Sequence, residues 1–183
     1  HTMRAEYENV LDDHLGQIHF TYVNTWDELL PAHWHEHLEI IYVLGGEITA
    51  SINDVSYELK KGDIFLVNSN DIHYTHTHED ARYYLLQIPP VHLERISAKW
   101  KGLKFQEFIR SKSADACVQG EQLENVQGKG LVEMRENRKS TNRADDLYDQ
   151  LRDVFRKIAG FYEEKKEGYH LLVLSAVYRL LYF

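Results

Sequence analysis

The chain has 183 residues, of which 43% are hydrophobic, and this is enough to fill the core of one domain of ordinary size. Its 21 Lys and Arg against 29 Asp and Glu give a net charge of -8 without any basic block, so direct binding of nucleic acid by this chain is not expected. The single cysteine, Cys117, excludes an internal disulfide, and no apolar segment resembles a signal peptide or is long enough to span a bilayer. These features predict a soluble protein of the reducing cytoplasm, with no membrane partner.

The first sixteen residues show no core pattern. His1 and Thr2 precede Met3 and are interpreted as a cloning remnant, and the rest of residues 1–16 is expected to be a flexible arm. From residue 17 onward, short segments rich in β-branched and aromatic residues alternate with turn residues. The expected strands are 17–23, 37–44, 47–52, 55–59, 64–67, 73–78 and 81–88, with a loop over 24–31, a short helix over 91–96 and a last strand near 103–109. This near-regular spacing predicts an antiparallel barrel or sandwich over residues 17–110.

The C-terminal part of the chain has a different period. Residues 111–143 are polar and weakly patterned, and they receive no assignment. From Leu147 to Tyr162, apolar residues three and four apart predict an amphipathic helix, with Asn142 as its N-cap. After Gly168, residues 169–183 are apolar nearly all round and predict a second helix that is buried on each side. The first helix can cover one side, and either the same chain or a partner subunit can cover the other.

Two groups of potential metal ligands flank the expected hairpins. His33, His35 and Glu39 all have odd residue numbers. In an extended segment, residues of the same parity (all odd or all even) project from one face, so these three side chains would lie together. If the strand with His73 lies against the strand with Glu39, three imidazoles and one carboxylate converge. This donor set suits a divalent transition metal such as Zn, Fe, Mn or Ni. Of the other histidines, His37 is expected at a solvated rim.

The spacing H-x-H-x3-E-x6-G resembles the first motif of the cupin family, and a second motif is echoed later; the residues are His33, His35, Glu39, Gly46, Gly62 and His73. The segment GDIFLVNSNDIH resembles more narrowly the sensor domains of AraC-type transcription regulators, although Ser69 stands where a proline is usual. The resemblance implies a cupin-like β-barrel (jelly roll) that binds an effector, followed by two packed α-helices for dimerisation over 144–183. The family's helix-turn-helix units, which read DNA, are expected outside this chain.

Three interpretations of the histidine and glutamate set remain open: a metal site, a pocket for a polar small molecule, or structural groups satisfied by the backbone. The resemblance favours the pocket. The expected effector-binding residues are His33, His35, Glu39 and His73, with Tyr22, Trp34, Tyr42 and Tyr84 available to stack against a ring. A carbohydrate is the preferred effector, although the same lining would suit other polar metabolites.

The resemblance implies a non-enzymatic, homodimeric sensor that acts on DNA through the missing units. An effector would shift the balance between arrangements of the arm, barrel and helices. The alternative is a metal-dependent cupin enzyme, an oxygenase or a sugar isomerase, that uses the metal as a Lewis acid. The enzymatic pattern would place Pro at Asn68 and Gly at Asn70, so the chain departs from it further than from the regulator pattern. A binding-only storage module is a third hypothesis.

Overall fold

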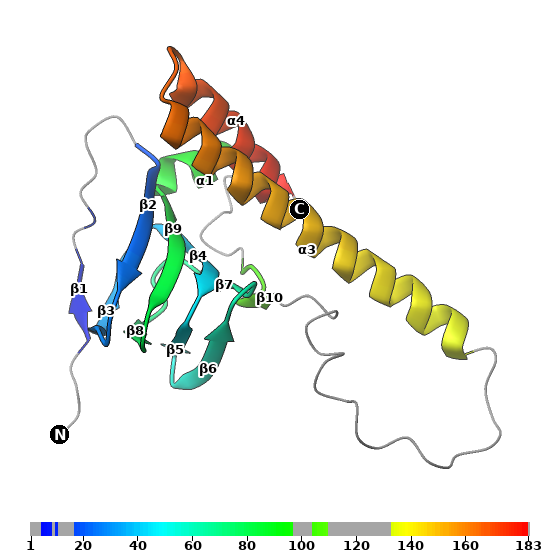
Figure 1. Ribbon diagram of the computed structural model, residues 1–183, viewed down its shortest axis with the longest axis horizontal. Coiled ribbons are helices and arrows are strands. Elements are labelled where there is room, and N and C mark those ends of the chain that lie inside the picture. Colours follow the sequence, from blue (N-terminus) through cyan, green and yellow to red (C-terminus); the bar gives the residue numbers. More distant parts are fainter. Residues whose placement is uncertain (1–4, 9, 11–16, 97–103, 110–132, 183) are drawn as a thin grey trace. The chain divides into compact units, whose positions relative to one another are not determined.

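The computed structural model describes residues 5–8, 10, 17–96, 104–109 and 133–182 (Figure 1). The chain divides into two compact units, His1–Ile109 and Arg110–Phe183. Most of the segment left unassigned from the sequence, together with Cys117, lies outside the described residues.

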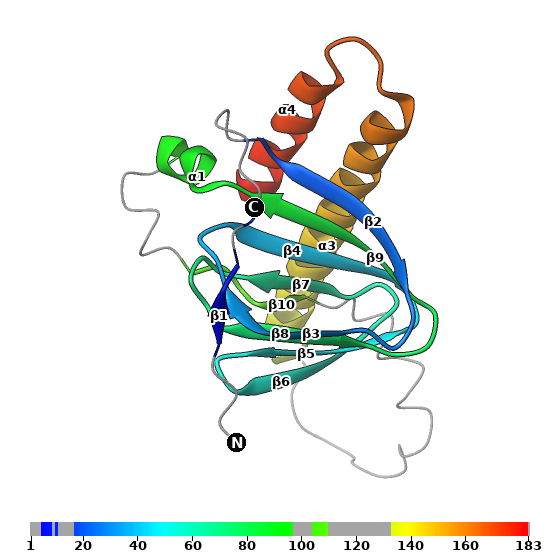
Figure 2. The same cartoon turned by 90° about the vertical axis from the view of Figure 1, so that its left-hand side faces the viewer.

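The first unit is a barrel of two five-stranded sheets that face each other (Figure 2). One sheet has the order β1-β3-β8-β5-β6 and the other has the order β10-β7-β4-β9-β2. The strands are β1 Glu6–Tyr7, β2 His19–Thr25, β3 Leu29–Trp34, β4 Leu38–Gly45, β5 Glu47–Ile52, β6 Val55–Lys60, β7 Ile64–Val67, β8 His73–Thr77, β9 Ala81–Ile88 and β10 Phe108–Ile109. Helix α1, Pro90–Ile96, follows β9. The prediction of a cupin-like antiparallel barrel followed by helices is confirmed.

Strand β3 begins at Leu29, inside the loop expected over residues 24–31, and β2 extends into the same range as far as Thr25. Strand β3 pairs with β8, but the register shifts: Leu30 lies opposite Thr75 and His33 lies opposite His73. Three steps along β3 therefore match two along β8, so β3 carries an extra residue. Such an insertion breaks the alternation of apolar and polar residues by which a strand is recognised in a sequence. Near residues 103–109, the expected last strand is restricted to β10, which pairs with β7.

Apolar side chains from the inward faces of both sheets fill the barrel. This core contains Ile41, Val43, Ile48, Ala50, Ile52, Leu59, Phe65, Val67, Ala81 and Tyr83. Fully burying a side chain of the size of Val, Leu, Ile or Phe contributes about 1.5–3 kcal/mol, so these residues are the main source of the barrel's stability. On β4 the inward residues Ile41 and Val43 have the same parity as Glu39, which directs Glu39 to the inside of the barrel as well.

Tight turns set the pairing of the hairpins. Gly46 links β4 to β5 with a φ of 73°, and a Cβ atom placed on it would lie 2.6 Å from the carbonyl oxygen of Asp80. Between β6 and β7, the carboxylate of Asp63 accepts the backbone N–H of Lys60 at 2.7 Å. Asp63 therefore caps its turn.

The second unit is a pair of helices, α3 from Glu133 to Glu164 and α4 from Tyr169 to Tyr182. The prediction that Asn142 caps the first helix is wrong, because Asn142 lies inside α3. The N-terminal part of α3 is largely polar and gives no apolar period to recognise. The buried residues of the pair are Tyr148, Leu151, Val154, Phe155, Ile158, Ala159, Val173, Ala176, Val177 and Leu180.

Helix α4 is not covered on every side by the described residues. Leu171, Leu172 and Tyr182 are 64%, 48% and 85% exposed. The expectation that α4 is buried all round is therefore not met within the described part of this chain. None of the helices in the described ranges is long and apolar enough to cross a membrane.

Candidate metal and effector site

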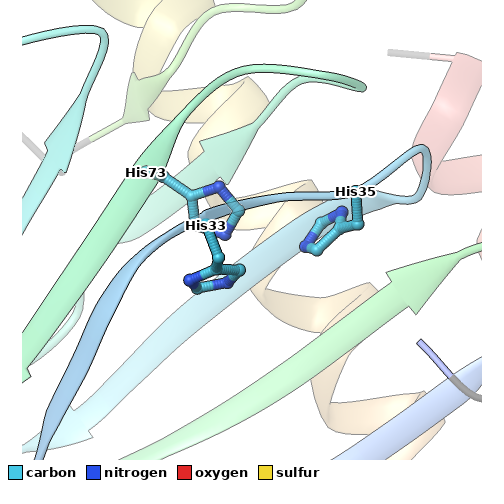
Figure 3. Close-up of side chains that lie close together, drawn as sticks. All are labelled: His33, His35 and His73. Atoms are coloured by element: carbon cyan, nitrogen blue, oxygen red, sulfur yellow. The ribbon is translucent and has the colours of Figure 1, made fainter. Parts of the chain in front are cut away.

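Three histidine rings converge inside the barrel (Figure 3). His33 lies on β3, His35 lies in the connection from β3 to β4, and His73 begins β8. Among the residues that the structure describes, these three form a group whose potential ligand atoms all lie within 4.8 Å of one another. The ring centroids of His33 and His73 are 4.1 Å apart, and those of His35 and His73 are 4.9 Å apart. His35 and His73 are each only 1% exposed.

The same backbone arrangement orients all three rings. The Nδ1 atom of each histidine lies within hydrogen-bond distance of a carbonyl oxygen two residues away: His33 to Pro31 at 2.7 Å, His35 to His37 at 3.1 Å, and His73 to Asp71 at 3.0 Å. Because a carbonyl oxygen only accepts, we assign a donating hydrogen to each Nδ1. The Nε2 atoms are then the groups available to the shared space between the rings.

Glu39 supplies a carboxylate to the same space from β4. Its Oε2 atom lies 3.1 Å from Nε2 of His35 and accepts a hydrogen bond from the amide of Gln87 at 2.9 Å. Its Oε1 atom lies 3.9 Å from Nε2 of His73. Burial alone would raise the pKa of Glu39, but the hydrogen bonds from His35 and Gln87 and the charges of the two histidines outweigh burial and lower the pKa to about 2. Glu39 is therefore a buried anion.

The pKa values of the two buried histidines shift in opposite directions. For His35, burial acts to lower the pKa, but the hydrogen bond to Glu39 and the nearby negative charges outweigh it and raise the pKa. For His73, burial is the largest effect and lowers the pKa, in spite of the charge of Glu39. His73 is therefore more readily kept neutral than His35, as a metal ligand must be.

The Nε2 atom of His73 is buried and has no hydrogen-bond partner. A buried polar atom of this kind is rare, because the loss of its contact with water is not compensated. A ligand bound between the rings would compensate it. The donor set of three imidazoles oriented through Nδ1 and one carboxylate held by Gln87 fits a divalent transition metal, since metal-bound histidines usually donate their other ring N–H to a carbonyl or carboxylate.

The connection that contains His35 and the connection that precedes His73 are tied to each other and to the chain around them. The N–H of Asn70, in the β7–β8 connection, donates to the carbonyl of His35, in the β3–β4 connection, at 2.8 Å. Asn68 makes two hydrogen bonds with the backbone of Phe105, at 3.2 and 2.8 Å. Asp71, whose carbonyl orients His73, forms an ion pair with Lys104 at 2.7 Å. These contacts hold the imidazoles in place without any bound group.

His33, His35, Glu39 and His73 come together, but not in the way that strand parity predicts. The chain crosses from one sheet to the other between His33 and Glu39, so these residues do not share one strand. Likewise, β4 and β8 do not pair, and Glu39 faces His73 across the barrel. The crossover, and not the alternation along a single strand, produces the cluster.

The structure does not bring the three predicted tyrosines to the histidines. Tyr22, Tyr84 and Tyr42 lie side by side on β2, β9 and β4. Tyr42 has the opposite parity to Glu39, so this row of tyrosines lies on the other face of the sheet. The expectation that these rings stack on a ligand in the histidine cavity is therefore wrong in its geometry.

Trp34 and His37 also differ from expectation. The ring of Trp34 packs edge-on against Tyr7, with ring centroids 4.7 Å apart, and is half-buried. His37 is 6% exposed and not solvated at a rim, because the crossover takes it into the interior.

The sequence patterns missed two residues of the site. Glu8, just after β1, places Oε2 3.5 Å from Nε2 of His33 and 3.9 Å from Nε2 of His35. No periodic signal marks it, because β1 has two residues only. Gln87, in contrast, could have been found, since it shares the inward parity of Tyr83 and Leu85 and is the polar member of that row.

A cavity of about 490 Å³ adjoins the cluster, lined by residues 6–8 on one side and 30–33 on the other. Glu8 and His33 belong both to this lining and to the cluster. A small molecule in the cavity would therefore contact the N-terminal strand and the histidines at the same time.

A model of the protein family described as AraC-like ligand binding domain matches residues 16–181. The chain belongs to this family. It is also similar to an uncharacterized HTH-type transcriptional regulator, YdeC, of Bacillus subtilis (strain 168), with 30% identity over 63 residues, which are 33% of this chain and 22% of the relative. The matched region thus spans less than a quarter of the relative's length.

Solved structures that resemble the barrel of this AraC-like domain include two proteins of low sequence identity. An RmlC-like cupin from Shewanella frigidimarina is 20% identical, with a TM-score of 0.39, over 40% of this chain and 68% of the other. KdgF from Halomonas sp. is 22% identical, with a TM-score of 0.38, over 42% of this chain and 74% of the other. These likenesses concern the barrel fold alone.

Proposed function

We propose that this AraC-like domain is the effector-sensing and dimerisation part of a transcription regulator, and that the histidine cluster and its adjoining cavity are the effector site. The convergence of three oriented imidazoles and a buried carboxylate beside a cavity of about 490 Å³ carries this proposal. The cavity has the size of an ordinary small-molecule site. The description of the matching family, a ligand-binding domain, supports the same function.

A divalent transition metal held by His33, His35, Glu39 and His73 would complete this site. When bound, it would supply a Lewis-acid centre for an oxygen atom of the effector. The residues of the chain contribute the orientation: the carbonyl groups at Nδ1 fix the rings, and Gln87 holds the carboxylate. We retain a carbohydrate as the proposed effector class, with Tyr7 in the cavity lining in place of the distant tyrosines.

The effector would act by shifting a conformational equilibrium. The walls of the cavity come from the N-terminal strand and from β3, so a ligand that touches both prefers the arrangement in which the strand is docked. The effector can change how DNA-binding units outside this chain are placed only if its affinity differs between the docked and the undocked arrangement. The exposed apolar residues Leu171, Leu172 and Tyr182 of α4 support dimerisation, and we propose the cytoplasm as the site of action.

The proposal is tested on the full-length gene product. Its affinity for its own promoter DNA is measured at constant salt with Zn²⁺, Mn²⁺ or Ni²⁺ added, with EDTA, and with a panel of monosaccharides. We expect at least one addition to change the affinity, and the change to disappear in His73→Ala. An intact protein that binds no DNA, or binds it equally in every condition, would refute the regulatory function.

A metal-dependent enzyme remains the second candidate, because an open cavity beside a metal donor set is also the arrangement of a catalytic metal site. Turnover of a sugar, or of a compound oxidised by O₂, would favour the enzyme over the sensor if that turnover is lost in His73→Ala.

A further inference from the structure

The N-terminal strand brings a second carboxylate to the histidine cluster. Glu8 approaches from the side of the cavity, and Glu39 approaches from inside the barrel. Oε2 of Glu8 lies 3.5 Å from Nε2 of His33 and 3.9 Å from Nε2 of His35. These separations are longer than a good hydrogen bond; they suit an ion pair when the rings are protonated, and they also leave room for an ion between the carboxylate and the rings.

The separations match those between ligands of one metal ion. Two donor atoms that are each about 2.1 Å from an ion lie about 3.0 Å apart when they are at right angles and about 4.2 Å apart when they are opposite. The distances from Glu8 to His33 and His35 fall inside this range, as do those from Glu39 to His35 and His73, at 3.1 and 3.9 Å. The buried Nε2 of His73, which has no hydrogen-bond partner, points to the same absent group.

The N-terminal strand is held to β3 by a short set of contacts. Strand β1 runs parallel to β3, with Glu6 opposite His33 and Tyr7 opposite Trp34. The N–H of Glu8 donates to the carbonyl of Trp34 at 2.9 Å, and both residues of β1 are exposed. A two-residue parallel pairing contributes little stability by itself, so one ligand bond from Glu8 would strongly favour the docked strand.

We propose that Glu8 is a fifth ligand of a divalent metal at His33, His35, Glu39 and His73, and that metal binding and docking of strand β1 on β3 are therefore one coupled event. The inference rests on the proposed metal site. It adds a role for the arm: Glu8 occupies the coordination position that faces the cavity, so bound metal keeps the strand docked and keeps the cavity wall formed by residues 6–8 in place for the effector.

Calorimetric titration of the 183-residue chain with Zn²⁺ and with Mn²⁺ tests the inference. We expect Glu8→Gln to weaken binding by about tenfold or more, the loss typical when a group that supports a metal site is removed. Glu36→Gln is the matched control, because Glu36 is exposed, adjoins His35 and carries the same charge. It should keep the wild-type affinity.

Hydrogen exchange of the Glu8 amide gives a second readout that separates coupling from a general effect of charge. Metal should slow this exchange in the wild type and in Glu36→Gln, and should leave it unchanged in Glu8→Gln. If wild type and Glu8→Gln bind metal equally and their arms exchange equally, the inference is overturned and the metal site stands. If the wild type binds neither metal, the metal site and the role of Glu8 fall together.

Discussion

Glu39 and His73 face each other from opposite sheets, with Oε1 of Glu39 3.9 Å from Nε2 of His73. Glu39 extends the inward row of β4 that also contains Ile41 and Val43, and His73 begins β8 in the other sheet. Their separation is therefore set by how the apolar core spaces the two sheets. These two residues are therefore placed by strands of the barrel, whereas His35 lies in the connection from β3 to β4.

Replacing His73 should abolish metal binding. His73→Ala removes one of three converging imidazoles, and we expect the affinity for Zn²⁺ to fall by at least about 100-fold, because the remaining groups cannot complete the donor set. Isothermal calorimetry measures the change. His76→Ala is the control, since His76 lies on the same strand, half-buried, with its ring bonded to Asp27. Equal losses in both variants would contradict the assigned site.

Gln87 should matter to the metal although it is not a ligand. Its amide donates to Oε2 of Glu39 at 2.9 Å and helps to keep this carboxylate ionised. We expect Gln87→Leu, which nearly preserves volume, to reduce metal affinity by about tenfold while the fold is retained. Circular dichroism checks the fold, and the same titration checks the affinity. A wild-type affinity in this variant would show that Gln87 has no positioning role.

In the metal-free chain, Glu39 should contribute to acid sensitivity. Its pKa of about 2 in the fold lies below the ordinary value of 4.5, so between these values the unfolded chain binds more protons at this residue than the folded chain does. The stability from this group is complete above pH 4.5 and is lost as the pH falls toward 2, by on the order of 3 kcal/mol. Urea unfolding at a series of pH values, with EDTA present, should show a shallower loss for Glu39→Gln. Parallel curves for the two proteins would contradict the assignment.

Two glycines should respond to alanine in opposite directions. Gly46→Ala forces a Cβ atom to within 2.6 Å of the Asp80 carbonyl at a φ of 73°, so we expect a loss of at least about 1 kcal/mol in the free energy of unfolding. Gly160→Ala, inside α3 with no atom within 4 Å of the added Cβ, should stabilise by up to about 1 kcal/mol. Thermal and urea unfolding of each variant measure the change in stability. If both substitutions destabilise the protein, the predicted opposite effects are wrong.

The sequence predicts the barrel well because most strands alternate regularly and end at turn residues. Strands β4 to β9 lie close to their expected bounds. The polar beginning of α3 and the irregular strand β3 were not, because neither has an apolar period. Periodicity reports on burial, so it cannot reveal an element with few buried apolar residues.

The four predicted ligands lie together in the fold, whereas the predicted aromatic neighbours do not. Parity along one strand is sufficient to place Glu39 inside, but it says nothing of a chain that crosses between sheets, as this one does before Leu38. The approach of Glu8 depends on a parallel pairing with β3, which no local pattern encodes. The local spacing of His33, His35 and Glu39 therefore does not determine which other residues approach them; long-range strand pairing does.

The extra residue of β3 is absorbed between Leu30 and His33, so Leu30 stays opposite Thr75 and His33 stays opposite His73. Deleting one codon at Ala32 would restore regular alternation and still leave His33 opposite His73. The apolar interior would keep every one of its members, and the three imidazoles would remain together. The imidazole set would in that case tolerate a change in the length of β3.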